Sequence, residues 1–244
     1  MNNKLNSTEE EEKLEKYLNK IAENLSYAIL SYETLMTISK NREEIEKQNY
    51  SNFFFPLERI LINDIILSLT KIFEKNTDSI TLWKTLSYLE CNQKKIVLKE
   101  NFNQLLKKYN LFDFKDIKIE NKTSFNELYK KDIQLEVFTE KSFINCLRKN
   151  INNLYTNYEP DLKALKNIRD QYIAHSDKTI IYNDKTTWNE ILKLIDFVKE
   201  FIDLLFFVYF RKVYSSDLAE SFEMNTSEAM KSNKCLLKIL KRDL

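Results

Sequence analysis

Apolar residues recur every three or four positions along most of the chain, which is the spacing of one buried helix face. The first such stretch follows Ser7 and Thr8, two typical N-cap residues, and begins with four glutamates that suit the positive end of a helix dipole. It predicts a helix that runs into the forties. Its expected buried face comprises Leu14, Leu18, Ile21, Leu25, Ile29 and Tyr32.

A second helix is predicted over "NFFFPLERILINDIILSLTKIFEK", with Pro56 near its first turn, where proline is tolerated. Shorter helices are predicted over 79–90 and 92–109. Residues 111–137 show no clear period and indicate an irregular insertion or a long connection. The apolar stripe expected on the second helix comprises Leu57, Ile60, Leu61, Ile65, Leu69, Ile72 and Phe73.

The C-terminal half predicts four more helices. "TEKSFINCLRKNINNLYTNY" forms the first, and the second begins near Pro160. The third is capped by Thr186 or Thr187, with Glu190 completing a capping box, and contains the apolar run "FIDLLFFVYF". "TSEAMKSNKCLLKILKRDL" forms a short basic amphipathic helix. We therefore expect a helical domain over 1–215 and a basic helical extension over 216–244.

Composition supports an all-α fold of long antiparallel helices. The chain contains no glycine and only two prolines, so tight hairpins and glycine-dependent nucleotide loops are excluded. The net charge of +1 favours neither nucleic acid nor a membrane surface as a general partner. The polar N-terminus does not resemble a signal peptide, and the longest apolar run is about half the length of a membrane span. We expect a cytoplasmic protein.

Cysteine and histidine usage excludes most metal sites. Cys91, Cys146 and Cys235 are far apart and form no paired motif, so free thiols are expected. The single histidine cannot complete a zinc site with them. No cofactor is therefore expected, although a cation site built from carboxylates alone stays open, because Asp and Glu are plentiful.

The one histidine, His175, lies in "KNIRDQYIAHSDK", six positions after Arg169. The guanidinium offers a planar fork of donors to a phosphate, and the imidazole titrates near neutral pH. Together they can cleave RNA without a metal: the imidazole takes the proton of a ribose 2′-hydroxyl, and the guanidinium stabilises the charged transition state. A structural alternative is a histidine at a helix C-terminus beside a solvated charged edge.

Geometry restricts how the pair can meet. On a continuous α-helix, residues six apart point about 120° apart. Either the helix ends or distorts near Ala174, as the turn-favouring Ser176 and Asp177 suggest, or each residue meets groups of a second subunit. A two-fold dimer would concentrate both pairs in one cleft.

The arrangement resembles the HEPN superfamily, whose signature is an arginine, four to six residues, and a histidine. "RDQYIAHSD", with the upstream "NDIILSLTKIFEK", looks most like its AbiU-type abortive-infection branch. The resemblance implies a helical bundle that dimerises through the motif helix and, in many members, metal-independent RNase activity in phage defence or toxin–antitoxin systems. It implies Arg169 and His175 as the catalytic pair and Asp170 as an auxiliary residue.

One position departs from the pattern. HEPN toxins regulated by nucleotide transfer carry a tyrosine two residues after the histidine, where this chain has Asp177. Two other functions stay open: a non-catalytic module that binds nucleotide or RNA, and a helical interaction protein such as an antitoxin-like partner. The expected partners of the leading hypothesis are RNA, a second copy of the chain and a regulatory protein.

Overall fold

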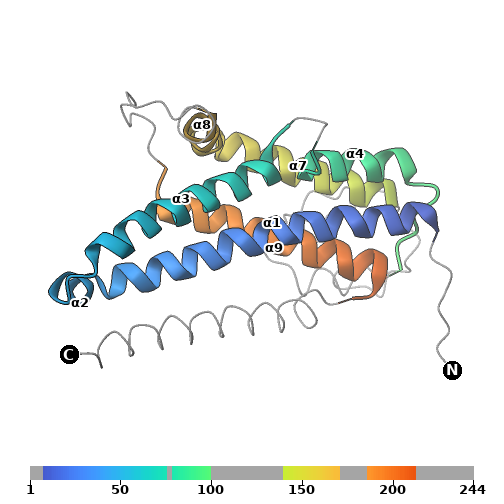
Figure 1. The fold of residues 1–244 in the computed structure, drawn as a ribbon. Coiled ribbons are helices and arrows are strands. Elements are labelled where there is room, and N and C mark those ends of the chain that lie inside the picture. Colours follow the sequence, from blue (N-terminus) through green and yellow to red (C-terminus); the bar gives the residue numbers. More distant parts are fainter. Residues whose placement is uncertain (1–7, 76–78, 100–139, 171–185, 213–244) are drawn as a thin grey trace, which may run out of the picture. The chain divides into compact units, whose positions relative to one another are not determined.

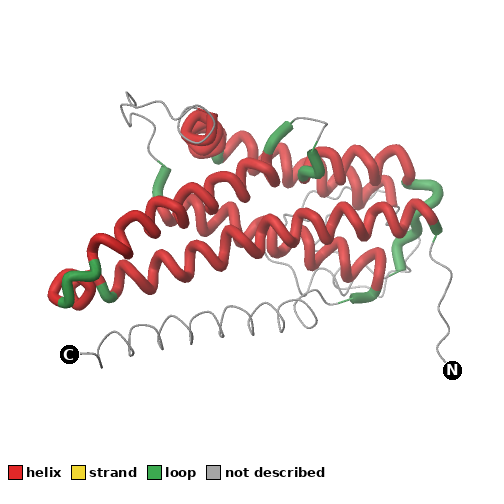
Figure 2. Tube along the Cα trace, viewed as in Figure 1, coloured by secondary structure: helices red, strands yellow, loops and turns green. Residues whose placement is uncertain are grey.

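The computed structural model describes residues 8–75, 79–99, 140–170 and 186–212. Within these ranges the chain folds into seven helices without a β-strand, so the predicted all-α class is confirmed (Figures 1 and 2). The expected insertion at 111–137 and the expected C-terminal helix lie outside the described residues, and the domain limits at 215 and 216 stay a prediction. The helices are α1 (Glu9–Lys40), α2 (Arg42–Lys47), α3 (Ser51–Phe73), α4 (Leu82–Asn92), α7 (Glu140–Asn157), α8 (Glu159–Ile168) and α9 (Trp188–Phe210).

The described chain divides into two compact units. The first unit contains residues 8–21, 73–75, 79–99, 140–159 and 196–212. The second contains residues 22–72, 160–170 and 186–195. Helices α1 and α9 contribute residues to both units, since the division falls within each of them.

In the first unit, α4 and α7 run antiparallel. The rings of Trp83 and Tyr155 lie 5.4 Å apart near one end, and Arg148 Nε donates to Glu90 Oε1 at 2.6 Å near the other. Behind these contacts the facing residues Leu86 and Leu147 are buried. The polar pairs therefore mark the rim of an apolar interface.

The N-terminal part of α1 also runs antiparallel to α4. Tyr17 and Tyr88 pair at 5.2 Å between ring centroids, and Glu10 pairs with Lys95, just beyond the end of α4, at 2.5 Å. Thr8 caps α1 as predicted, because its Oγ1 accepts from the Glu11 amide at 3.2 Å.

In the second unit, α3 folds back along the C-terminal part of α1 (Figure 1). Ser31 Oγ donates to Asp64 Oδ2 at 2.5 Å, and Arg42 pairs with Glu58 at 2.7 Å, so the two helices run antiparallel. The turn between them contains a small core of Ile38, Ile45 and Phe54, against which Tyr50, Leu57 and Leu61 pack.

One helix end differs from the prediction. The first helix ends at Lys40, and α2 begins at Arg42 after the single turn residue Asn41. Pro56 lies near the start of α3, which begins at Ser51 after a left-handed Asn49 (φ 59°). Asparagine there takes the conformation that glycine usually supplies.

The helix predicted over 92–109 is wrong at its start. Residues 93–99 form a turn and a non-helical stretch, and the Lys99 amide donates to the Val208 carbonyl of α9 at 2.8 Å. This hydrogen bond joins the segment after α4 to α9. Residues 100–109 lie outside the described ranges.

The residues expected on the first two apolar faces are buried, except Tyr32, Leu57 and Leu61, which are half-buried, and Ile60, which is exposed. Ile60 was expected in the buried stripe of α3, yet 62% of its surface is exposed. The start of α3 is covered only on the side that meets the small core of Ile38, Ile45 and Phe54. Ile60 lies away from that side.

Candidate active site

Helix α8 positions the first two residues of the predicted site. Pro160 stands at its second position, where a missing amide hydrogen costs nothing, and Ala164 and Leu165 form its buried side. Asp161 Oδ1 accepts from Thr186 Oγ1 at 2.8 Å, which ties the start of α8 to the segment entering α9. Thr187 Oγ1 then caps α9 by accepting from the Glu190 amide at 3.4 Å.

Arg169 and Asp170 follow Ile168, the last residue of regular α-helix. Their backbone adopts the wider π-type turn, a distortion that is frequent at functional sites. Regular α-helix therefore ends before Arg169. The end or distortion expected near Ala174 lies outside the described residues and stays a prediction. A side chain after this turn need not follow α-helical spacing from Arg169.

The side chains of Arg169 and Asp170 contact each other. Arg169 Nε donates to Asp170 Oδ1 at 2.7 Å, and its Nη2 lies 2.7 Å from the same oxygen. The arginine side chain is 20% exposed and the aspartate side chain 44% exposed. The third predicted residue, His175, lies outside the described residues, so the structure brings together two of the three.

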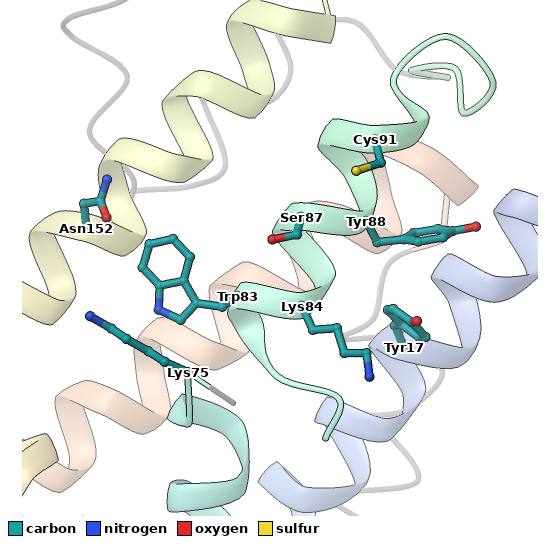
Figure 3. A pocket seen from close by; sticks show the side chains of 8 residues that line it. All are labelled: Tyr17, Lys75, Trp83, Lys84, Ser87, Tyr88, Cys91 and Asn152. Atoms are coloured by element: carbon teal, nitrogen blue, oxygen red, sulfur yellow. The ribbon is translucent and has the colours of Figure 1, made fainter. Parts of the chain in front are cut away.

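A groove over α4 is a second candidate site, which the sequence analysis did not identify. It has a volume of about 630 Å³, a size typical of small-ligand sites, and lies wholly within the first unit. Figure 3 shows its lining side chains. They are Tyr17, Lys75, Trp83, Lys84, Ser87, Tyr88, Cys91 and Asn152.

A buried polar pair lies elsewhere in the first unit. Glu140 Oε1, at the start of α7, and the Tyr209 hydroxyl of α9 are both buried and have no hydrogen-bond partner among the described residues. Burial raises the pKa of Glu140 to about 7, and burial together with the Glu140 charge raises the pKa of Tyr209. Glu140 therefore titrates in the neutral range.

Comparison with family models matches residues 11–230 to the AbiU2 family of HEPN proteins. The chain belongs to this family. Comparisons with curated proteins and with solved structures gave no match. The AbiU2 family is the abortive-infection branch of the HEPN superfamily that the Arg169–His175 window resembles, so the resemblance inferred from the sequence is confirmed.

The other potential sites of this AbiU2-family chain are limited. No cluster of three or more His, Cys, Asp or Glu side chains in the described part of the chain could hold a metal ion. Cys91 and Cys146 are free thiols, as expected, and Cys235 lies outside the described residues. No helix among the described residues is long and apolar enough to cross a membrane.

Sequence reasoning missed the groove for a physical reason. Its side chains come from α1, the segment after α3, α4 and α7, and no short window contains the set (Figure 3). The only available signal was that Trp83 and Ser87 lie four residues apart, beside the buried stripe of a short helix. An aromatic residue at that position usually indicates packing.

Proposed function

We propose that this AbiU2-family protein is a metal-independent endoribonuclease of the HEPN type. His175 takes the proton of a ribose 2′-hydroxyl, and the freed oxygen attacks the adjacent phosphorus. The bond to the 5′-oxygen breaks, and that oxygen leaves with a proton. The products are a 2′,3′-cyclic phosphate and a 5′-hydroxyl, and DNA is spared because it lacks the 2′-hydroxyl.

Arg169 stabilises the charge that develops on the phosphorane-like transition state. The single observation that supports the proposal is the position of Arg169 in a chain that belongs to the AbiU2 family. Its guanidinium lies at the π-type turn after α8 and is partly exposed to solvent. Asp170 is the auxiliary residue. It accepts from Nε and lies 2.7 Å from Nη2, and in this way it orients the guanidinium.

A second candidate is a non-catalytic module that binds RNA or nucleotide phosphate. The contact between Arg169 and Asp170 favours it, since the carboxylate offsets part of the charge that a transition state requires. In that case the arginine and histidine bind phosphate without turning substrate over.

The biological setting follows from the family. We propose a role in phage defence by abortive infection or in a toxin–antitoxin system, with RNA as substrate and a regulatory or antitoxin protein as a further partner. We also propose a homodimer through the motif helix. Support comes from the second unit, which contains Arg169 and also exposes several large apolar side chains.

Purified wild type and His175→Ala, incubated with total cellular RNA in EDTA, test the proposal. We expect cleavage with 2′,3′-cyclic phosphate ends by the wild type only. Lys166→Ala is a matched control, because it removes an exposed positive charge from the same helix, and it should cleave normally. If the wild type and both variants are folded and leave RNA intact, the binding module replaces the enzyme.

A further inference from the structure

We propose that the groove over α4 binds an unpaired RNA segment, stacking a base on its aromatic side chains and holding the neighbouring phosphate with Lys75. The inference rests on the proposed function in one respect, namely that RNA is the substrate. The groove shares no residue with the proposed catalytic set of Arg169, Asp170 and His175.

Lys75 gives the groove a fixed positive charge. Its ammonium lies 4.9 Å from the ring centroid of Tyr155 and 5.7 Å from that of Trp83. Among the described residues it is held by these two rings and not by a carboxylate. A lysine held by aromatic rings keeps its positive charge available for a phosphate. Because its side chain is already ordered, less conformational entropy is lost when the phosphate binds.

The aromatic side chains supply surfaces for bases. Trp83 is half-buried, while its neighbours Leu82 and Leu86 are buried. Stacking on such rings is the usual way proteins bind single-stranded nucleic acid, because every base has a π-face. Duplex RNA has no free base face, so the groove fits loops, bulges and ends.

Polar side chains lie on both sides of this aromatic surface. Figure 3 shows Trp83 and Ser87 directed toward the side where Asn152 lies, and Lys84 and Tyr88 directed toward Tyr17. The amide can bond a base edge, and the serine hydroxyl can bond a ribose. Hydrogen bonds to the 2′-hydroxyl are what let a site distinguish RNA from DNA.

The charge distribution indicates where the phosphate lies. At the α1 end of the groove, Glu10 pairs with Lys95 and Lys13 lies 5.2 Å from the ring centroid of Tyr88, so carboxylates and cations offset each other there. Figure 3 shows the end of Lys84 beside Tyr17, whereas Lys75 lies next to Trp83, 5.7 Å from its ring centroid. This arrangement places the base at Trp83 and its phosphate at Lys75.

Binding can be measured in EDTA by fluorescence anisotropy with a labelled 12-nucleotide single-stranded RNA, using His175→Ala as the parent so that nothing is cleaved. We expect Lys75→Glu to weaken binding about tenfold or more and to lower the slope of log affinity against log salt by about one. Lys16→Glu is the matched control. It makes the same charge change on an exposed residue of α1 outside the groove, and it should bind nearly as well as the parent.

A second readout does not depend on altering the groove. The chain contains two tryptophans, so Trp188→Phe in the His175→Ala parent leaves Trp83 as the only emitter. We expect RNA to quench its fluorescence as a base stacks on it, with the same midpoint as the anisotropy curve. A duplex of the same sequence should quench much less.

Three results overturn the proposal: equal affinity of Lys75→Glu and the parent, an unchanged Trp83 emission at saturating RNA, or an acidic peptide that displaces the RNA and binds more tightly. The last would assign the groove to a protein partner. The proposed function fails separately, through the wild type's inability to cleave. An inactive wild type that loses RNA binding on Lys75→Glu would keep the groove and reject the enzyme.

Discussion

The two units differ in their ion pairs and in the apolar side chains that they expose. In the first unit, ion pairs join residues of two different helices, or of a helix and a neighbouring segment. These pairs lie at the rim of the apolar interfaces. In the second unit, one described ion pair joins two helices, Arg42 of α2 with Glu58 of α3, and the others are local, namely Arg169 with Asp170 and Glu190 with Lys193. The first unit has one local pair, Asp196–Lys199, and four that join different segments: Glu10–Lys95, Glu11–Lys99, Glu15–Lys212 and Glu90–Arg148.

Exposed apolar residues show the same contrast. Of the large apolar side chains exposed in the described chain, only Val97 belongs to the first unit. The second unit exposes Tyr27, Phe53, Phe55, Ile60 and Trp188. Exposed apolar patches mark interaction sites, so the unit that contains Arg169 is the one expected to meet another chain. The first unit buries its own apolar surface and leaves a groove.

The largest effect expected is on catalysis in the second unit. Arg169→Lys keeps the charge and removes the planar fork, so we expect RNA cleavage to fall about 100-fold. The free energy of unfolding should change by less than about 0.5 kcal/mol, because the side chain is at the end of α8 and partly exposed. Single-turnover cleavage and urea denaturation measure the two quantities.

Lys166→Arg is the control for this change. It makes the reverse exchange on an exposed position of the same helix and should leave cleavage unchanged. Normal cleavage by Arg169→Lys would show that only its charge matters and would favour phosphate binding over stabilisation of a transition state.

The next effect concerns assembly. Ile60→Asp places a charge on an apolar side chain that is 62% exposed in the second unit, and we expect the dimer dissociation constant to rise at least about tenfold. Val97→Asp, at 60% exposure in the first unit, is a matched control and should not affect assembly. Sedimentation over a dilution series measures both. Equal dissociation of the two variants would remove the distinction between the units.

A smaller effect concerns the stability of the first unit. The folded-state pKa of Glu140, about 7, lies above the ordinary value of 4.5. Below pH 4.5 the carboxyl is protonated in both the folded and the unfolded state, and ionisation has no effect. Between 4.5 and 7 the unfolded chain loses its proton first, so stability falls as pH rises, and above 7 the full cost remains.

Glu140→Gln should remove this dependence. We expect the variant to gain about 1 kcal/mol over wild type at pH 8 relative to pH 4.5, a value discounted because the side chain is only partly buried. Urea denaturation at the two pH values provides the measurement. Glu159→Gln removes an exposed carboxylate and should show no such gain. A gain of the same size in both variants would mean that burial of Glu140 is not the cause.

The sequence predicted the helices well because their apolar residues repeat with the helical period. Every residue expected on the buried face of the last described helix, from Ile191 to Tyr209, is buried in α9. The errors occur where the end of a helix or the exposure of a side chain depends on contacts that residue spacing does not reveal. α1 ends at Lys40, before the predicted end, and Ile60 is 62% exposed although it was expected in the buried stripe of α3.

The site was predictable in part. A short window contains Arg169 and Asp170 together, so a linear motif identifies them, although the π-type turn that carries them leaves no signal in the sequence. The groove depends on how α1, α4 and α7 are arranged in space. Lys75 and Trp83 lie on either side of the connection between α3 and α4, and residue spacing alone does not predict such a contact.

The smallest effect distinguishes the units at their helix caps. Thr81 caps α4 in the first unit: it is fully buried, and its Oγ1 accepts from the Lys84 amide at 3.1 Å. Thr187 caps α9 in the second unit, where it is exposed and its bond is 3.4 Å long.

We expect Thr81→Ala to lower the free energy of unfolding by about 1 kcal/mol and Thr187→Ala by about half as much, since water replaces the lost bond only at the exposed cap. Thermal denaturation of both variants, with Thr81→Ser as a control that retains the hydroxyl, measures the difference. Equal losses would mean that solvent reaches both caps alike, and the first unit would then be less closed than its ion pairs indicate.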